Sequence, residues 1–304
     1  MLRFIELTKR NMRIYLRDRG AVFFSLLSMV IVLILMLVFL GDMSVDSLIN
    51  GLAEMPDRNA ETDRKNAELM ITLWTCAGIV AINAPTVTLA VYSAMIKDRS
   101  EGRLASIYTA PVSRISIASS YIASAWLCSV IICTITLVIS EIYCIMKGME
   151  IFSAAAHLML FGMICANSFT YASFMYLLAL LVKTEGAWSG IGTVIGTLVG
   201  FLGGIYLPMG SVSESIGNIL KCTPVIYGAK MFRSIMTEDI TDTIFADVPD
   251  RVKADFLEDM GITLEFFGND VSNTACVILL VLCGIIFLMA GAAVTRKAAR
   301  SHKS

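Results

Sequence analysis

The chain has 304 residues, of which 57% are hydrophobic and only 16% are charged, and its mean hydropathy is +0.75. Ordinary soluble domains carry about a quarter charged residues, so this composition excludes a soluble globular protein and predicts an integral membrane protein. The formal net charge of −1 excludes the strongly basic chain of a nucleic-acid-binding protein, and we expect the lipid bilayer, with no nucleic acid, as its environment.

Six apolar runs are long enough to cross a bilayer. The hydrocarbon core is about 30 Å thick, which a helix rising 1.5 Å per residue crosses in about 20 residues. The predicted spans cover residues 21–40, 69–96, 115–144, 154–182, 188–207 and 274–294. The first run is too long for the apolar core of a signal peptide and has no small-residue cleavage site after it. We therefore expect an all-α integral membrane protein with six transmembrane helices, organised as one transmembrane domain over residues 1–304.

The basic residues predict the orientation of these spans. An even number of spans places both termini on one side of the membrane. The segments on that side carry 15 of the 24 Lys and Arg residues and only five acids, whereas the other side carries nine basic and 19 acidic residues. By the positive-inside rule, both termini are cytoplasmic, and we expect a multi-pass protein of the cell membrane.

Two stretches outside the spans also have helical patterns. Residues 2–19 place arginines on one stripe and apolar residues on another, which predicts an amphipathic helix at the cytoplasmic interface with its arginines near anionic headgroups. The alternative is a basic flank that only orients the first span. The external segment 208–273 is broken at Thr223–Pro224, which predicts short helices before the last span, followed by an acidic cap over residues 238–273.

Between the second and third spans lies the charged segment KDRSEGRLASIYTAPVSR, residues 97–114. Ser100 is a favourable N-cap, Glu101 suits a first helical turn, and Pro111 ends the helix near Ala110. The predicted helix, residues 100–110, is about 15 Å long and too short to cross a bilayer. The helical spacing places Leu104, Ile107, Tyr108 and Pro111 toward the membrane domain or a partner protein, and Asp98, Arg99 and Arg103 toward water.

This segment resembles the coupling segment of ABC transporter permeases of the type 2 exporter class. The matching residues are Asp98, Arg99, Gly102, Leu104, Ile107, Pro111, Val112, Ser113 and Arg114, and we add Glu101 and Tyr108 to the candidate coupling residues. The order of the predicted segments is also similar to that of this family. The resemblance implies an ATP-driven exporter in which a separate cytoplasmic ATPase subunit docks on this helix and a second permease chain, identical or paralogous, completes the transport path.

The chain itself lacks the GxxxxGK[ST] motif that binds nucleotide phosphates. We therefore expect no cofactor, metal ion or catalytic site in this chain, and the resemblance implies that ATP and Mg²⁺ bind to the ATPase partner. A membrane-embedded enzyme would need a cluster of acid, base, nucleophile or metal ligands, and the sequence offers no such set.

The predicted spans contain two further candidate features. Gly192, Gly196, Gly200 and Gly204 recur every four residues, which fits either a seam between two permeases beside the transport path or ordinary packing within one chain. Asn83 and Pro85 fit either a kinked helix that lines the path or an ordinary proline-containing span.

Two other functions stay open at this point. An ion-coupled secondary transporter predicts several ionisable residues at mid-membrane and an internal repeat. The only carboxylate well inside a predicted span is Glu141, which we place close to the outer interface, as an interfacial residue or as part of a substrate site. A non-transporting membrane subunit of a transporter is the other alternative.

Overall fold

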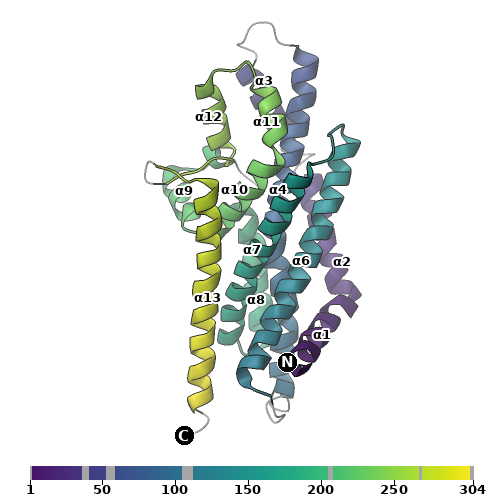
Figure 1. Cartoon of the computed structure of the whole chain (residues 1–304), viewed down its shortest axis with the longest axis vertical. Helices are drawn as coiled ribbons and strands as arrows, with labels where there is room; N and C mark the ends of the chain where they lie inside the picture. The colour runs from purple at the N-terminus through teal and green to yellow at the C-terminus, as the bar shows by residue number, and fades with distance from the viewer. Residues whose placement is uncertain are drawn as a thin grey trace.

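The computed structural model describes residues 2–35, 41–52, 59–104, 112–204, 208–266 and 269–301, which form an elongated helical bundle (Figure 1). The helices with membrane-spanning or flanking roles are α1 (Leu2–Arg17), α2 (Arg19–Leu35), α4 (Ala60–Ser100), α6 (Arg114–Met146), α7 (Ala154–Leu181), α8 (Glu185–Leu202) and α13 (Asn273–Ser301). The shorter elements are α3 (Gly41–Leu52), η2 (Met209–Ser211), α9 (Glu214–Lys221), α10 (Pro224–Met236), α11 (Glu238–Ile244), α12 (Asp250–Asp259), β1 (Glu265–Phe266) and β2 (Asn269–Asp270).

Four of the described helices are long and apolar enough to cross a membrane, namely α4, α6, α7 and α13. This finding supports an all-α membrane protein. The described parts of α2 and α8 do not reach the same standard, and residues 36–40 and 205–207, which complete the first and fifth predicted spans, lie outside the described residues. The count of six spans therefore stays a prediction.

Helix α4 is longer than its predicted span of residues 69–96. Its 41 residues correspond to about 60 Å, roughly twice the thickness of a bilayer core. The side chain of Asn59 caps it by accepting hydrogen bonds from the amides of Glu61 and Thr62, at 3.0 and 3.3 Å. Hydropathy identifies only the apolar part of a helix, so the sequence-based prediction did not include the charged first turns of α4.

The bundle is built around α4, which contacts α1, α2, α3, α6, α7, α8, α10 and α11. The last helix, α13, packs mainly on α7. Two glycines allow this close approach: a Cβ atom would come within 2.9 Å of Phe169 at Gly284 and within 2.8 Å of Tyr176 at Gly291. Small residues at such contacts let transmembrane helices pack tightly.

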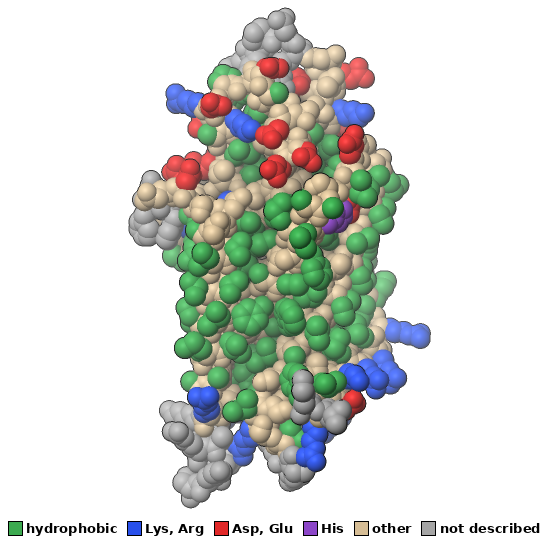
Figure 2. Space-filling model, viewed as in Figure 1, with side chains coloured by type: hydrophobic (Ala, Val, Ile, Leu, Met, Phe, Trp, Pro, Cys, Tyr) green, Lys and Arg blue, Asp and Glu red, His purple; other side chains and the backbone are tan. Residues whose placement is uncertain are grey.

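The two ends of the bundle differ in charge (Figure 2). Acidic side chains gather at the end that holds α3, α11 and α12, basic side chains gather at the opposite end, and a hydrophobic band lies between them. We refer to these as the acidic end and the basic end. Both termini of the chain lie at the basic end (Figure 1), as an even number of crossings requires.

The acidic end contains more regular structure than a cap of acidic composition suggests. The chain breaks at Cys222–Thr223 between α9 and α10, with Pro224 as the first residue of α10, which is the predicted proline break. Helix α3 was not predicted; its buried Val45 and Leu48 join the hydrophobic core. The short antiparallel hairpin of β1 and β2 was also not predicted.

Helix α1 packs across α6 and also contacts α4. The predicted amphipathic helix thus forms over Leu2–Arg17, and Asp18 separates it from α2 by accepting a hydrogen bond from the amide of Ala21 at 3.0 Å. Its buried residues are Thr8, Asn11 and Tyr15.

Candidate functional site at the basic end

The last turn of α4 marks where the predicted coupling helix was expected to begin. Ser100 is the final residue of α4 and does not cap a new helix; its hydroxyl oxygen lies 3.1 Å from the carbonyl oxygen of Lys97 in the same helix. Glu101 follows as the C-cap, and Gly102 adopts φ = 74°, a left-handed conformation that favours glycine. The predicted start at Ser100 is therefore corrected: helical structure resumes only at Arg103 and Leu104.

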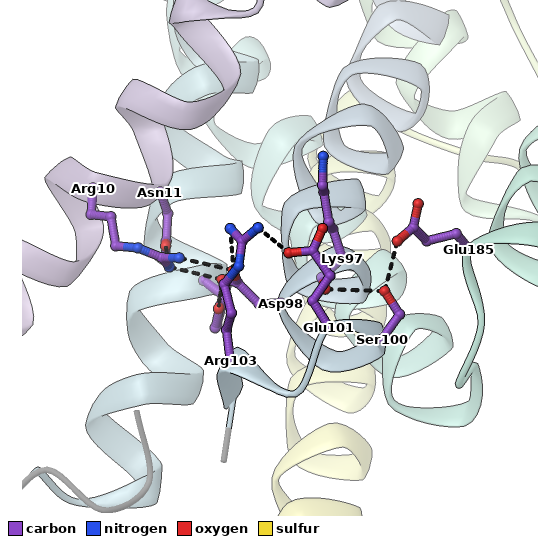
Figure 3. Close-up of polar contacts among 9 residues, drawn as sticks. Arg10, Asn11, Lys97, Asp98, Ser100, Glu101, Arg103 and Glu185 are labelled. Atoms are coloured by element: carbon purple, nitrogen blue, oxygen red, sulfur yellow. Dashed lines mark hydrogen bonds and ion pairs between the residues drawn. The ribbon is translucent and has the colours of Figure 1, made fainter. Parts of the chain in front are cut away.

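Asp98 is the centre of a buried polar cluster (Figure 3). Its carboxylate accepts two hydrogen bonds from the guanidinium group of Arg10, at 2.8 and 2.9 Å, and one from the hydroxyl group of Tyr121 at 2.7 Å. Arg103 lies 3.9 Å away and also pairs with Glu101. Because Arg10, Asp98 and Tyr121 belong to α1, α4 and α6, this cluster joins three helices at the basic end.

This arrangement corrects two expectations. The side chain of Asp98 is only 2% exposed, so it does not face water. Arg10 does not extend toward headgroups but is about two-thirds buried against Asp98, and its hydrogen bond to that carboxylate raises the pKa of the guanidinium group above its usual value. A bidentate arginine–carboxylate pair of this kind is strong and fixes the relative orientation of the two helices.

The two residues after Asp98 extend the contacts to the other helices. The guanidinium group of Arg99 donates to the carbonyls of Ala179 and Val182, at 2.8 and 2.5 Å, and so caps the C-terminal end of α7. Ser100 donates to the carboxylate of Glu185 in the first turn of α8 at 2.6 Å (Figure 3). Three consecutive residues of α4 therefore bind α1, α6, α7 and α8.

The remaining predicted coupling residues are only partly described. Leu104 is buried in the hydrophobic core, in agreement with its predicted apolar face. Ile107, Tyr108 and Pro111 lie outside the described residues. Arg114 is the first residue of α6, where the side chain of Ser113 caps the helix by accepting a hydrogen bond from the amide of Ser116 at 3.1 Å.

Asn83 and Pro85 are buried between helices of the same chain. Proline cannot donate the backbone hydrogen bond that the carbonyl of Ala81 would otherwise accept, and the side chain of Asn167 in α7 donates to this carbonyl instead, at 2.9 Å. Asn83 donates to the hydroxyl group of Thr136 in α6 at 2.6 Å. These contacts hold α4 against α6 and α7, and the path-lining role of Asn83 and Pro85 stays a prediction.

The glycines of α8 do not share one environment. A Cβ atom at Gly192 would lie 3.2 Å from Leu89 of α4, whereas one at Gly196 would meet nothing within 4 Å. Gly200 is buried, and Gly204 follows the helix with φ = 62°. Gly192 therefore packs within the chain, and Gly196 faces outward.

A cavity of about 770 Å³ lies beside this contact, between the α1–α2 junction, α4 and α8. Its lining combines apolar side chains with Asp18, Lys97 and Glu185 at the basic end. The indole N–H of Trp188 donates to Ser93 at 3.1 Å, which holds α8 against α4. The exposed Val194 and Leu198 continue the outward face of α8 above the cavity.

A family model described as ABC-2 family transporter protein matches residues 48–294 of this chain. The chain belongs to this family. It is accordingly an ABC-2 type permease, a class that works in a membrane together with an ABC ATPase. The matched range contains the last turn of α4, the residues after it and α6 to α8, while α1 and α2 lie before it. A comparison with curated proteins finds no match.

Several residues that build this permease were not identified from the sequence. Arg10 and Tyr121 gave no signal, because each is ordinary in its own helix and only the fold brings both to Asp98. At the acidic end, Arg233 of α10 is fully buried and donates to the carbonyls of Gly203 and Gly204 after α8, at 3.0 and 2.9 Å. The sequence signal that could have identified Arg233 is its position among apolar residues, because a buried arginine requires hydrogen-bond partners.

Proposed function

We propose that this permease is the membrane subunit of an ATP-driven exporter, with six transmembrane helices and both termini in the cytoplasm. Two such chains, identical or paralogous, and two copies of a cytoplasmic ATPase form the working unit. The observation that carries the proposal is the last turn of α4, where Asp98, Arg99 and Ser100, at the start of the candidate coupling segment, bind four other helices.

This turn provides a mechanical route from a cytoplasmic ATPase into the bundle. A movement of the segment after Gly102 acts first on the end of α4. Because the Arg10–Asp98 pair is short, bidentate and mostly buried, α1 and α6 move with α4 instead of sliding past it. Arg99 and Ser100 transmit the same displacement to the end of α7 and the start of α8. We infer that closure of the ATPase pair tilts these helices together and opens the transport path.

The path itself is proposed to lie on the side of the chain that carries α2 and α8. The 770 Å³ cavity lies between these helices, with α4 behind it. Among the described helices α8 packs mainly on α4 and also contacts α10, and the side chains of Val194 and Leu198 on its outward face are exposed. A second permease packed against this face would enclose a path between the two chains.

We propose that the chain has no catalytic activity of its own and that ATP and Mg²⁺ bind to the partner ATPase. No nucleotide phosphate-binding motif occurs in the sequence, and the described residues contain no group of His, Cys, Asp and Glu that could hold a metal ion. No contact among the described residues favours an ion-coupled transporter or a non-transporting subunit over this proposal. Glu141, the carboxylate within a predicted span, is buried near the acidic end, where it accepts a hydrogen bond from the amide of Phe152 and pairs with His157 at 3.0 Å.

Topology mapping tests the proposed orientation. In a Cys222→Ser background, which removes the exposed thiol of the acidic end, a membrane-impermeant maleimide is expected to label Glu238→Cys in intact cells. The same reagent is expected to label Lys97→Cys only after lysis. Labelling of Lys97→Cys in intact cells would place the last turn of α4 outside and overturn the coupling assignment.

Purification of the tagged full-length chain from its native cell tests the partner. We expect a nucleotide-binding protein to copurify, and we expect Glu101→Arg or Ile107→Asp to lower both its recovery and ATP-dependent transport. Glu238→Arg, a charge reversal of the same kind at the acidic end, is the matched control and is expected to leave both unchanged. Equal effects of the three variants, or no associated ATPase, contradict the proposal.

A further inference from the structure

A second cavity, of about 500 Å³, opens on a different side of the bundle from the proposed path. Its walls are α6 and α13, which contact each other only sparsely, and its floor is α7, which packs on both. The lining residues are Ser113, Arg114, Ile115, Ala118, Ser119, Ile122, Tyr176, Leu288, Ala292, Thr295 and Arg296. We call this cavity the α6–α13 groove.

The polar and apolar residues of the groove are separated by depth. Arg114 directly precedes the predicted span of residues 115–144, and Arg296 lies two residues after the predicted span of residues 274–294, so both arginines lie at the level where lipid begins at the basic end. Ile122 and Leu288 lie eight residues further into their helices, which is about 12 Å deeper on each wall. The groove therefore has a cationic mouth and an apolar interior at matching depths.

The floor of the groove is fixed in place. Tyr176 of α7 is only 2% exposed, and its hydroxyl group shares a hydrogen bond of 2.8 Å with Thr295 of α13. Ile115, at the mouth, is 60% exposed, so this wall is open toward the surrounding bilayer. A ligand can thus enter sideways from the lipid phase, whereas a water-soluble partner would have to reach about 12 Å below the headgroup level to fill the interior.

From this arrangement we infer that the α6–α13 groove is a binding site for an anionic phospholipid of the leaflet at the basic end. The phosphate group lies between Arg114 and Arg296, where charge complementarity favours it, and one acyl chain lies along Ile122, Leu288 and Ala292. Arginine suits this role because its planar guanidinium group can donate two hydrogen bonds to a phosphate. The volume of the groove is within the range of ordinary ligand sites, about 300–1,000 Å³.

The inference does not depend on the direction of transport or on the ATPase. The groove and the proposed path share no lining residue. The lipid would support the packing of α6 against α13 where the two helices themselves make few contacts. If the export assignment is wrong, the lipid site is unaffected, and if the lipid site is wrong, the export assignment is unaffected.

Protection of a single thiol in the groove tests the site. Ser119→Cys, a nearly isosteric change, is introduced into the full-length protein in neutral detergent, and its alkylation is quantified by mass spectrometry of the peptide that contains it. Phosphatidylglycerol is expected to slow alkylation at a lower mole fraction than phosphatidylcholine. An attraction of about 1 kcal/mol for each basic residue near anionic lipid corresponds to about a fivefold difference for each arginine.

Two variants separate a built site from general surface charge. Arg114→Gln and Arg296→Gln are each expected to raise the half-protecting mole fraction of phosphatidylglycerol about fivefold. Arg296 is exposed and lies on a different helix from Arg114, so it keeps the test valid if the Arg114 variant does not fold. Arg13→Gln removes an exposed charge from α1 at the same end and is expected to change nothing.

Three results would overturn the inference. Equal protection by phosphatidylglycerol and phosphatidylcholine would show that the mouth does not select a charge. A loss of protection in Arg13→Gln as large as that in Arg296→Gln would assign the effect to the net charge of the surface. Protection by added inorganic phosphate alone, or only after addition of the ATPase subunit, would show that the occupant is not a lipid.

Discussion

The Arg10–Asp98 pair allows a quantitative test of how the basic end is held together. Asp98 is almost fully buried, whereas the side chain of Arg10 is 34% exposed. Arg10→Met leaves the carboxylate buried, with a hydrogen bond from Tyr121 and with the mostly exposed Arg103 3.9 Å away, and removal of one partner of a buried pair costs about 3–5 kcal/mol. Asp98→Leu leaves a guanidinium group that can turn toward water, so we expect a smaller cost of about 2 kcal/mol.

The decisive measurement is the double variant Arg10→Met/Asp98→Leu. It leaves neither charge buried, so we expect it to be less destabilised than Arg10→Met alone, by about 2 kcal/mol. At about 2 °C per kcal/mol, the midpoint of thermal unfolding in detergent should fall by about 8 °C for Arg10→Met and by about half as much for the double variant.

The control is Arg13→Met, which removes an exposed arginine from the same helix and should change stability by less than about 0.5 kcal/mol. If the effects of the two single variants simply add in the double variant, Arg10 and Asp98 act independently. The proposed mechanical link between α1 and α4 would then be refuted.

Further variants probe other contacts by the same unfolding measurement. Asn167→Leu should lower the free energy of unfolding by about 1–3 kcal/mol, because it removes the donor to the carbonyl of Ala81 that Pro85 leaves free. In a Pro85→Ala background the backbone donor returns, so the same change should cost clearly less. Equal costs in the two backgrounds would contradict this explanation. Arg233→Lys should cost about 2 kcal/mol or more, because a compact ammonium group cannot donate to the carbonyls of Gly203 and Gly204 and also stack on the ring of Trp74, whose centroid lies 4.2 Å from the guanidinium carbon. A neutral result would show that charge alone matters. Gly102→Ala should cost about 1 kcal/mol through its positive φ, whereas Gly196→Ala, in an open part of α8, should be neutral or stabilising.

The boundary of the coupling segment shows why local sequence signals were insufficient. Ser100 followed by Glu101 is a favourable start for a helix, but Gly102 directly afterwards is an equally favourable end. The contacts of Ser100 with Lys97 and Glu185 resolve this competition in favour of the end of α4. The α8 residue that takes part is 85 positions away in the sequence, so no short pattern contains it.

The same limit applies to the charged residues. Asp98 is a charged residue that follows an apolar run, which predicted the end of a span and a side chain in water, and the second of these predictions is wrong. The main partner of Asp98 is Arg10, which lies 88 residues earlier in the chain. In the same way, Asn167, which donates to the carbonyl of Ala81, lies 86 residues after Ala81. Sequence periodicity reports which face a residue occupies on its own helix and carries no information on the helix that covers this face.

The amino-acid sequence by itself determined that this is an α-helical membrane protein of the ABC-2 family with oppositely charged ends. Those properties follow from the cost of placing polar groups in lipid and from a short family motif, and both act on contiguous residues. Only the tertiary structure decided which helices the end of α4 holds, how Pro85 is accommodated and where α6 and α13 leave a groove. Each of these depends on helices that are distant in the chain and become neighbours only when the bundle packs.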